Sequence, residues 1–300
     1  MTRAPLTGPP RCADLADADG DAREGTAPPA DRWLLIEHAG PWERNALAVF
    51  DADVLAALTR WAGRTRGRIV LIRRPGRRTP RGDAPRRWFR VDARPGHEEI
   101  RTGEYRGDAE LAAVGDLAGH RSDRPLTLVC AHGKHDTCCA IRGRPLAAAL
   151  AAADPEGTWE CSHIGGCRFA PAVVLLPHGF TFGGVGPAEA VSLVRGYARG
   201  TLAPDTLRGR SSVPPVVQAA QHHARAATGA TGVDDLNPVA YASEDDGVWR
   251  VTLTRPECTV LLRERHVTVD RPLTCAARPP GHIRVFDPVE VLTAEGRALR

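Results

Sequence analysis

Residues 125–139, PLTLVCAHGKHDTCC, lead from a short apolar run into a polar loop that contains three of the chain's eight cysteines. The run at 125–130 predicts a strand, and RGRPLAAALAAADP at 142–155 predicts a helix that is ended by Pro155. A second short strand, TWECS at 158–162, leads into another segment with cysteine and histidine, CSHIGGCRFA at 161–170. The two cysteine segments therefore lie on loops that follow neighbouring predicted strands.

The same order of elements extends outward from this stretch. Downstream, residues 172–185 predict a hairpin that turns at His178 and Gly179, and residues 187–200 predict a helix. Upstream, a strand, a helix, two strands and a second helix are predicted at 33–38, 51–64, 68–74, 87–93 and 107–119. Residues 1–30 are rich in Pro, Asp, Gly and Ala without periodicity, so we expect an extended lead-in.

These elements predict an α/β (α+β) fold in which thioredoxin-like sheets are flanked by helices. We expect two consecutive thioredoxin-like units, one at 31–120 without ligands and one at 121–202 that carries the cysteine loops. Residues 203–300 predict a small α+β domain of unknown role. Its elements are a helix at 211–229 followed by alternating strands at 247–255, 258–264, 266–270 and 282–292.

Composition places the chain among globular proteins and suggests its compartment. Apolar residues make up 42% and charged residues 25% of the 300 residues. The longest apolar run, AAALAAA at 147–153, is far shorter than the roughly 20 residues that cross a bilayer. The first residues lack the apolar core of a secretory signal, so we expect a cytoplasmic protein without a membrane segment. Because cytoplasmic thiols stay reduced, clustered cysteines there indicate metal or redox chemistry.

A strongly basic segment lies between Arg64 and Arg90, where eleven arginines occur. Such a patch could attract an acidic redox partner, but a solvated loop between two strands is the more ordinary interpretation. The formal net charge of the chain is only +4, and Lys134 is its one lysine. Without a recognisable nucleic-acid-binding motif, we do not expect nucleic acid as a partner.

Four residues form a candidate metal-binding set: Cys130, Cys139, His163 and Cys167. Thiolates and imidazoles bind zinc, or iron in an iron–sulfur cluster. Gly165 and Gly166 separate the second pair, which predicts a loop whose backbone can wrap closely around a group. The C-x8-C spacing is wider than the C-x2–4-C knuckle of structural zinc sites, and a longer loop can span a two-iron cluster. Five cysteines within 38 residues are too clustered to be only small core residues.

The segments LVCAHGKHDTCCAIRGRPL at 128–146 and WECSHIGGCRFAPAVVLLPHGFTFGGV at 159–185 resemble the sucrase/ferredoxin-like family. The resemblance implies a thioredoxin-like ferredoxin with a 2Fe–2S cluster. Its C-x8-C ligands map onto Cys130 and Cys139, and its H-x3-H ligands map onto His163 and position 167. Position 167 is Cys in this chain, which implies three thiolates and one imidazole.

Neighbouring residues leave alternatives for the ligand set. Cys138 and Cys161 are alternates to Cys139 and His163. Other residues close to the candidate ligands could donate hydrogen bonds to sulfur, balance its charge or help to dock a partner, namely His132, Lys134, His135 and Arg168. Cys12, Cys258 and Cys275 have no metal-like spacing, so we expect them to be structural.

The resemblance implies electron transfer rather than catalysis, with a redox partner protein that the sequence does not identify. The alternatives are a zinc-stabilised binding module and a thiol-based redox or iron sensor. Enzymes of thiol exchange usually carry a C-x-x-C pair, and this chain has none. Sucrose hydrolysis would need two facing carboxylates, and no glycosidase motif supplies them.

Overall fold

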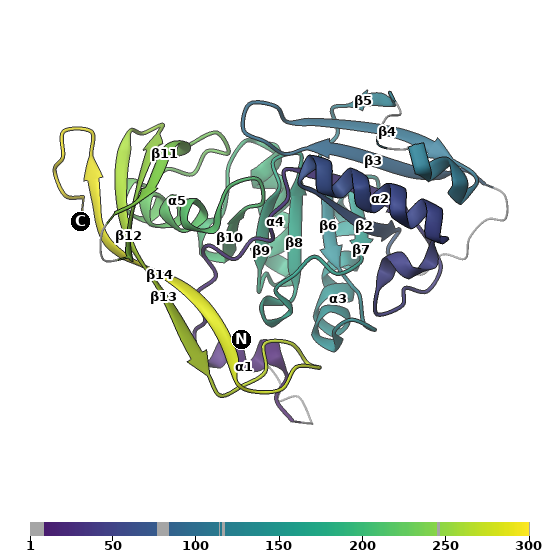
Figure 1. Cartoon of the computed structure of the whole chain (residues 1–300), viewed down its shortest axis with the longest axis horizontal. Coiled ribbons are helices and arrows are strands. Elements are labelled where there is room, and N and C mark those ends of the chain that lie inside the picture. Colours follow the sequence, from purple (N-terminus) through teal and green to yellow (C-terminus); the bar gives the residue numbers. More distant parts are fainter. Residues whose placement is uncertain (1–8, 77–83, 114, 116–117, 245–246, 300) are drawn as a thin grey trace.

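A computed structural model describes residues 9–76, 84–113, 115, 118–244 and 247–299. The chain forms a ten-stranded sheet flanked by helices and a separate four-stranded sheet (Figure 1). The mixed α/β class and the smaller C-terminal sheet predicted from the sequence are therefore confirmed. Among the described residues, none of the helices combines the length and the apolar character that crossing a membrane requires.

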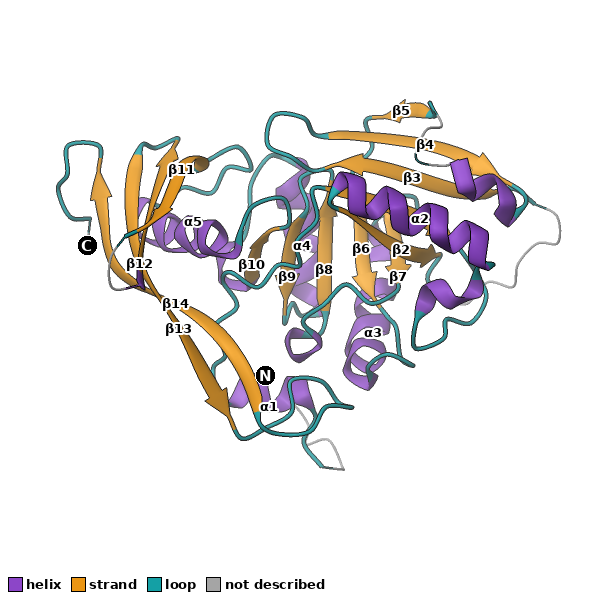
Figure 2. Cartoon of the chain, viewed as in Figure 1, coloured by secondary structure: helices purple, strands orange, loops and turns teal. Residues whose placement is uncertain are grey.

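Figure 2 shows the helices, strands and loops in separate colours. The α-helices are α1 Cys12–Ala18, α2 Ala52–Thr65, α3 Thr137–Ala153, α4 Pro187–Ala198 and α5 Pro215–Thr228. The 3-10 turns are η1 Ala46–Val49, η2 Asp108–Ala113, η3 Cys167–Phe169 and η4 Pro204–Thr206. The strands of the large sheet are β1 Arg32–Glu37, β2 Gly67–Arg73, β3 Arg86–Asp92, β4 Glu99–Tyr105, β5 His120–Ser122, β6 Leu126–Cys130, β7 Thr158–Cys161, β8 Ala172–Leu176, β9 Phe180–Gly183 and β10 Leu207–Arg210. Those of the small sheet are β11 Asn237–Ser243, β12 Val248–Thr254, β13 Cys258–Val269 and β14 Gly281–Thr293.

The large sheet contains the same strand arrangement twice. Its order is β10-β9-β8-β6-β7-β2-β1-β3-β4-β5. In the first half β1 pairs in parallel with β2 and antiparallel with β3, and in the second half β6 pairs in parallel with β7 and antiparallel with β8. The halves join through a short antiparallel pairing of β2 with β7, in which Ile72 lies opposite Cys161. One continuous sheet therefore spans the two predicted units.

Alternation along the strands divides the core of this sheet into separate clusters. Leu34 and Ile36 of β1 pack with α2 in one cluster, and Val129 of β6 packs with α3 and α4 in another. The alternate positions of the same strands, such as Leu35 and Cys130, belong to a third cluster that runs through both halves. The candidate ligand cysteines lie in this shared core.

Two basic residues at the end of β2 reinforce the joint between the halves. Arg73 pairs with the buried Glu160 of β7 at 2.8 Å. Arg74 donates to the carbonyl oxygens of Pro155 and Glu156 at 2.8 and 2.9 Å, and its guanidinium lies 3.6 Å from the ring centroid of Trp159. This part of the basic segment is used inside the molecule, while its residues 77–83 lie outside the described residues.

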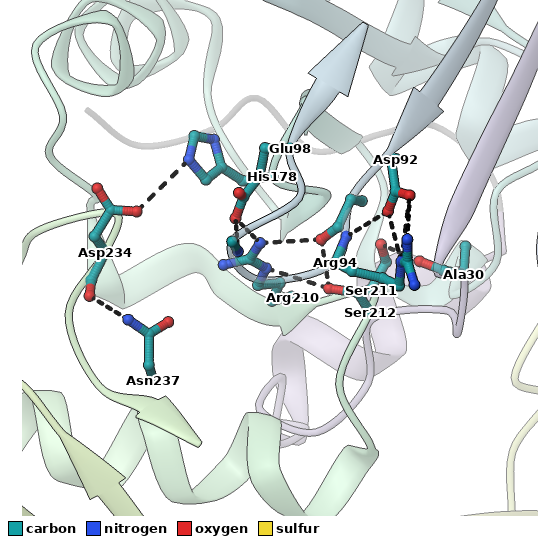
Figure 3. Close-up of polar contacts among 12 residues, drawn as sticks. Ala30, Asp92, Arg94, Glu98, His178, Arg210, Ser211, Ser212, Asp234 and Asn237 are labelled. Carbon is teal, nitrogen blue, oxygen red and sulfur yellow. Dashed lines mark hydrogen bonds and ion pairs between the residues drawn. The ribbon is translucent and has the colours of Figure 1, made fainter. Parts of the chain in front are cut away.

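A buried arginine at the end of β10 ties this edge strand to the connection between β3 and β4 (Figure 3). Arg210 pairs with Glu98 and donates to the Ala93 carbonyl oxygen at 3.0 Å and to Ser212 Oγ at 3.2 Å. His178, at the β8–β9 turn, lies beside the same network and approaches Asp234 at 4.0 Å. The predicted hairpin turn at His178 is confirmed by the pairing of β8 with β9.

The structure differs from the sequence expectation in several elements. The expected extended lead-in contains α1, whose Cys12 and Ala13 are buried. The helix expected at 107–119 is the short turn η2 over its described part. Strand β10 lies beyond the predicted boundary at residue 202 yet pairs with β9 of the large sheet. The two strands predicted at 258–264 and 266–270 form one long β13, because β14 pairs with it along its whole length.

Candidate metal centre

The centre is built where β6 ends and α3 begins. Cys130 is the last residue of β6, and Asp136 is the N-cap of α3, where its carboxylate accepts the Cys138 N–H at 2.9 Å. This cap starts the helix at Thr137, five residues earlier than the sequence predicts. Cys138 and Cys139 therefore lie in the first helical turn rather than in a loop. Successive helical residues point about 100° apart, so the two thiols face different groups.

The four predicted ligands converge at this point. The ligand atoms of Cys130, Cys139 and His163 lie within 4.8 Å of one another, as do those of Cys139 and Cys167 together with Asp136. The Cys167 Sγ lies 3.5 Å from Nδ1 of His163. The three cysteines are 1–2% exposed, and His163 is half-buried. These groups can hold a metal ion, since thiolate and imidazole are the donors of zinc and iron–sulfur sites.

The helix can approach the strand this closely because position 143 is glycine. A Cβ at Gly143 would lie 2.0 Å from the carbonyl oxygen of Cys130. No side chain fits that space, so the end of β6 and the first turns of α3 bring Cys130 and Cys139 together. The sequence alone shows Gly143 but not that it packs against Cys130.

The second ligand loop has left-handed backbone at Gly165 and Gly166, with φ of 94° and 73°. A Cβ at Gly166 would lie 2.3 Å from the Arg208 guanidinium. Arg208 is 1% exposed and donates to the Gly165 carbonyl oxygen at 3.1 Å. The glycine pair thus allows the loop to fold over a buried cation, in agreement with the close wrapping expected from the sequence.

The sequence profile described as sucrase/ferredoxin-like matches residues 24–209. The chain belongs to the sucrase/ferredoxin-like family. The match includes both cysteine segments and ends in β10, the edge strand of the large sheet. No curated protein and no solved structure matches the chain.

In this sucrase/ferredoxin-like protein, hydrogen bonds among the four side chains favour the thiolate form of Cys130 and Cys167. The thiol of Cys139 lies against Cys130 and Cys167 and lowers the pKa of both of these residues, while its own pKa is raised. Burial lowers the pKa of His163, but its contacts with the Cys130 and Cys167 thiols outweigh burial and raise the pKa to about 9. Thiolate is the form that binds metals.

Two guanidinium groups, one buried and one half-buried, balance this negative charge. Burial lowers the pKa of Arg208 to about 9, so the side chain remains charged at neutral pH. Arg68 is half-buried; burial lowers its pKa, partly opposed by the Cys161 and Cys130 side chains, and it donates to the His163 carbonyl oxygen at 3.4 Å. The predicted charge-balancing residue Arg168 instead pairs with Asp21 at 2.9 Å. Neither Arg68 nor Arg208 has a local sequence signal, because both approach the loop from distant strands.

The histidines of the loop at 131–136 hold His163 in place. His132 Nε2–H donates to the Glu43 carbonyl oxygen at 2.7 Å, so its Nδ1 is free to accept the His163 N–H at 3.2 Å. His135 stacks on His163 with ring centroids 3.6 Å apart. Lys134 points to the surface and pairs with Glu43. His132 and His135 therefore both contact His163, and a backbone hydrogen bond from His132 also lowers the pKa of the Cys130 thiol.

The remaining cysteines fall into distinct environments. Cys161 is buried on β7 opposite Cys130 and belongs to none of the metal-binding groups found among the described residues. Cys258 lies in the core of the small domain, as expected for a structural residue. Cys12 and Cys275 meet Cys138 and Asp136 in a second group of ligand atoms, which the sequence did not predict. Cys12 and Cys275 are too far from Cys138 along the chain for a spacing argument to find this group. Asp136 could have been found, because an aspartate directly before a helix is a typical N-cap.

Proposed function

We propose that this protein transfers electrons through a 2Fe–2S cluster held by Cys130, Cys139, His163 and Cys167. The observation that carries the proposal is the convergence of these side chains, from β6, α3 and the loop after β7, in a member of the sucrase/ferredoxin-like family. When bound, such a cluster takes up and releases one electron at a time. Cys139 is favoured over Cys138 because the Cys138 thiol lies in the other group.

The arrangement of the donors favours a binuclear cluster over a single zinc ion. One tetrahedral ion needs four donors within about 4 Å of one another. Among the described residues, the four candidate side chains are divided among overlapping triads, two of which also include His135 or Asp136, and no group within 4.8 Å contains all four. Two pairs of ligands, Cys130 with Cys139 and His163 with Cys167, match the need of two metal ions.

The residues around the centre supply the other requirements of an electron carrier. Arg68 and Arg208 offset thiolate charge, and His132 fixes the orientation of the His163 backbone. The three cysteine ligands are buried, whereas His163 and the stacked His135 are half-buried. We infer that a partner docks at this histidine edge, because these rings are partly exposed while the cysteine ligands are buried. The identity of that partner, including its expected acidic character, stays a prediction.

The test is the composition of protein purified without oxygen. We expect a red-brown protein with about two irons and two acid-labile sulfides per chain. Cys130→Ser and Cys139→Ser should lose both, while Cys258→Ser, a change of a buried cysteine in the small domain, should keep them. A colourless wild-type protein that stays colourless after anaerobic reconstitution with iron and sulfide would overturn the proposal.

A further inference from the structure

A second set of cysteines meets at the N-terminal end of α3, on segments far apart in the sequence. Cys12 comes from α1, Cys138 from the first turn of α3, and Cys275 from the connection between β13 and β14. Their Sγ atoms form a triangle, with 3.7 Å between Cys12 and Cys138, 3.4 Å between Cys138 and Cys275, and 3.5 Å between Cys12 and Cys275. The long β13–β14 pair carries its tip down to α1 (Figure 1).

Asp136 provides a fourth donor to this triangle. Its carboxylate accepts the N–H of Cys138 at 2.9 Å and the N–H of Cys275 at 2.8 Å, and Oδ2 lies 3.7 Å from the Cys12 Sγ. The four ligand atoms all lie within 4.8 Å of one another. Each carboxylate oxygen has a second lone pair, so the backbone hydrogen bonds orient the group without exhausting its capacity to bind a cation.

The size of the triangle matches a tetrahedral metal site. With a Zn–S bond of about 2.3 Å, two sulfurs of a tetrahedron lie about 3.8 Å apart. All three observed separations are at or slightly below this value. A disulfide would need a bond of about 2.05 Å between two of the sulfurs and would leave the third thiol unused. Three nearly equidistant sulfurs beside a carboxylate therefore fit one cation better than one disulfide.

Ion pairs hold the contributing segments together independently of the cysteines. Arg271, close to Cys275, pairs with Asp19 and Asp21 just after α1. Arg142 of α3 pairs with Asp14 and Asp17 of α1. These contacts place the three cysteine-bearing segments side by side. Cys275 is exposed, which gives a cation a route into a site whose other members are buried.

We propose that Cys12, Cys138, Cys275 and Asp136 bind a zinc ion in a site separate from the centre formed by Cys130, Cys139, His163 and Cys167. This site does not depend on the electron-transfer proposal. The zinc ion would link α1 and the β13–β14 tip to the start of α3, directly beside the other centre. Its role is structural, since all four donors come from the protein.

The test is zinc content measured beside iron content in the full chain, purified anaerobically without chelators. We expect about one zinc per chain in the wild-type protein. Cys275→Ser, at an exposed position, should lower zinc at least fivefold and leave iron unchanged, and Cys275→His should restore zinc because imidazole also binds it. Cys258→Ser should change neither metal, and Cys130→Ser should lower iron while it retains zinc.

Adding Co²⁺ to reduced, metal-free protein gives a second measurement. Visible bands of tetrahedral thiolate-bound cobalt should be present in Cys130→Ser, where the other centre lacks a ligand, and be lost when Cys275→Ser is added to that variant. The proposal is overturned if wild-type protein binds neither added Zn²⁺ nor Co²⁺. It is also overturned if zinc is insensitive to Cys275→Ser, or if anaerobically purified protein contains a Cys12–Cys275 disulfide. Absence of iron with zinc retained would instead contradict only the electron-transfer proposal.

Discussion

Replacing Asp136 should destabilise the fold by more than the loss of an ordinary helix cap. Its carboxylate is 2% exposed and accepts N–H groups from both Cys138 and Cys275. Loss of an N-cap side chain costs about 0.5–2 kcal/mol, and a stranded buried N–H costs about 1–3 kcal/mol. Water can reach the exposed Cys275, so the lower part of the second range applies. We expect Asp136→Ala to lower the free energy of unfolding by about 2–3 kcal/mol.

Two variants separate the contributions to this loss. Asp136→Asn retains one carbonyl oxygen but presents an NH₂ group to the other N–H, so we expect a loss of about 1 kcal/mol. Asp51→Ala is the matched control, because Asp51 is the exposed N-cap of α2 and its side chain makes no capping hydrogen bond. Its effect should stay within about 0.5 kcal/mol.

The assay is urea unfolding followed by circular dichroism, on reduced protein stripped of metal, so that metal binding does not contribute to stability. Midpoints are compared only where the slope of the free energy with urea concentration is unchanged. A loss below about 0.5 kcal/mol for Asp136→Ala, or an equal loss for Asp51→Ala, would refute the link between α3 and the β13–β14 tip.

Three further outcomes follow from individual positions. If His163 is a ligand, His163→Cys should keep the chromophore and lower its midpoint potential by roughly 100 mV, since thiolate adds negative charge; an unchanged potential in a redox titration would contradict the assignment. Gly143→Ala should lower the free energy of unfolding by about 3 kcal/mol, because the new Cβ would meet the Cys130 carbonyl oxygen at 2.0 Å. Gly63→Ala is the control, since it has open space around it and should stabilise α2 by about 0.5–1 kcal/mol. Equal urea midpoints for the two variants would show that α3 does not approach β6 so closely. Burial holds the pKa of His178 below its usual 6.5, so the unfolded state binds the proton first as the pH falls below that value. The free energy of unfolding should therefore decrease by up to about 1.4 kcal/mol per pH unit. His178→Gln should reduce this slope, and an identical slope in urea unfolding across acidic pH would contradict the argument.

The local patterns of the sequence were sufficient for most of the large sheet. Apolar runs at 33–38 and 68–74 and at 125–130 and 158–162 correspond to β1, β2, β6 and β7, and the hairpin at His178 forms as expected. Alternation and helical periodicity act over a few residues, which is why they predict an element but not its boundary. The start of α3 was missed because its cap, Asp136, precedes the apolar part of the helix.

The cysteine and histidine spacing by itself singled out Cys130, Cys139, His163 and Cys167 as a candidate ligand set, since each pair is close along the chain and lies next to a predicted strand. Only the tertiary structure decided which vicinal thiol faces which group, because a turn of about 100° per helical residue separates Cys138 from Cys139. It alone brought Cys12 and Cys275 to Cys138. Contacts between such distant segments depend on how α1 and the β13–β14 tip pack, and no local spacing records that packing.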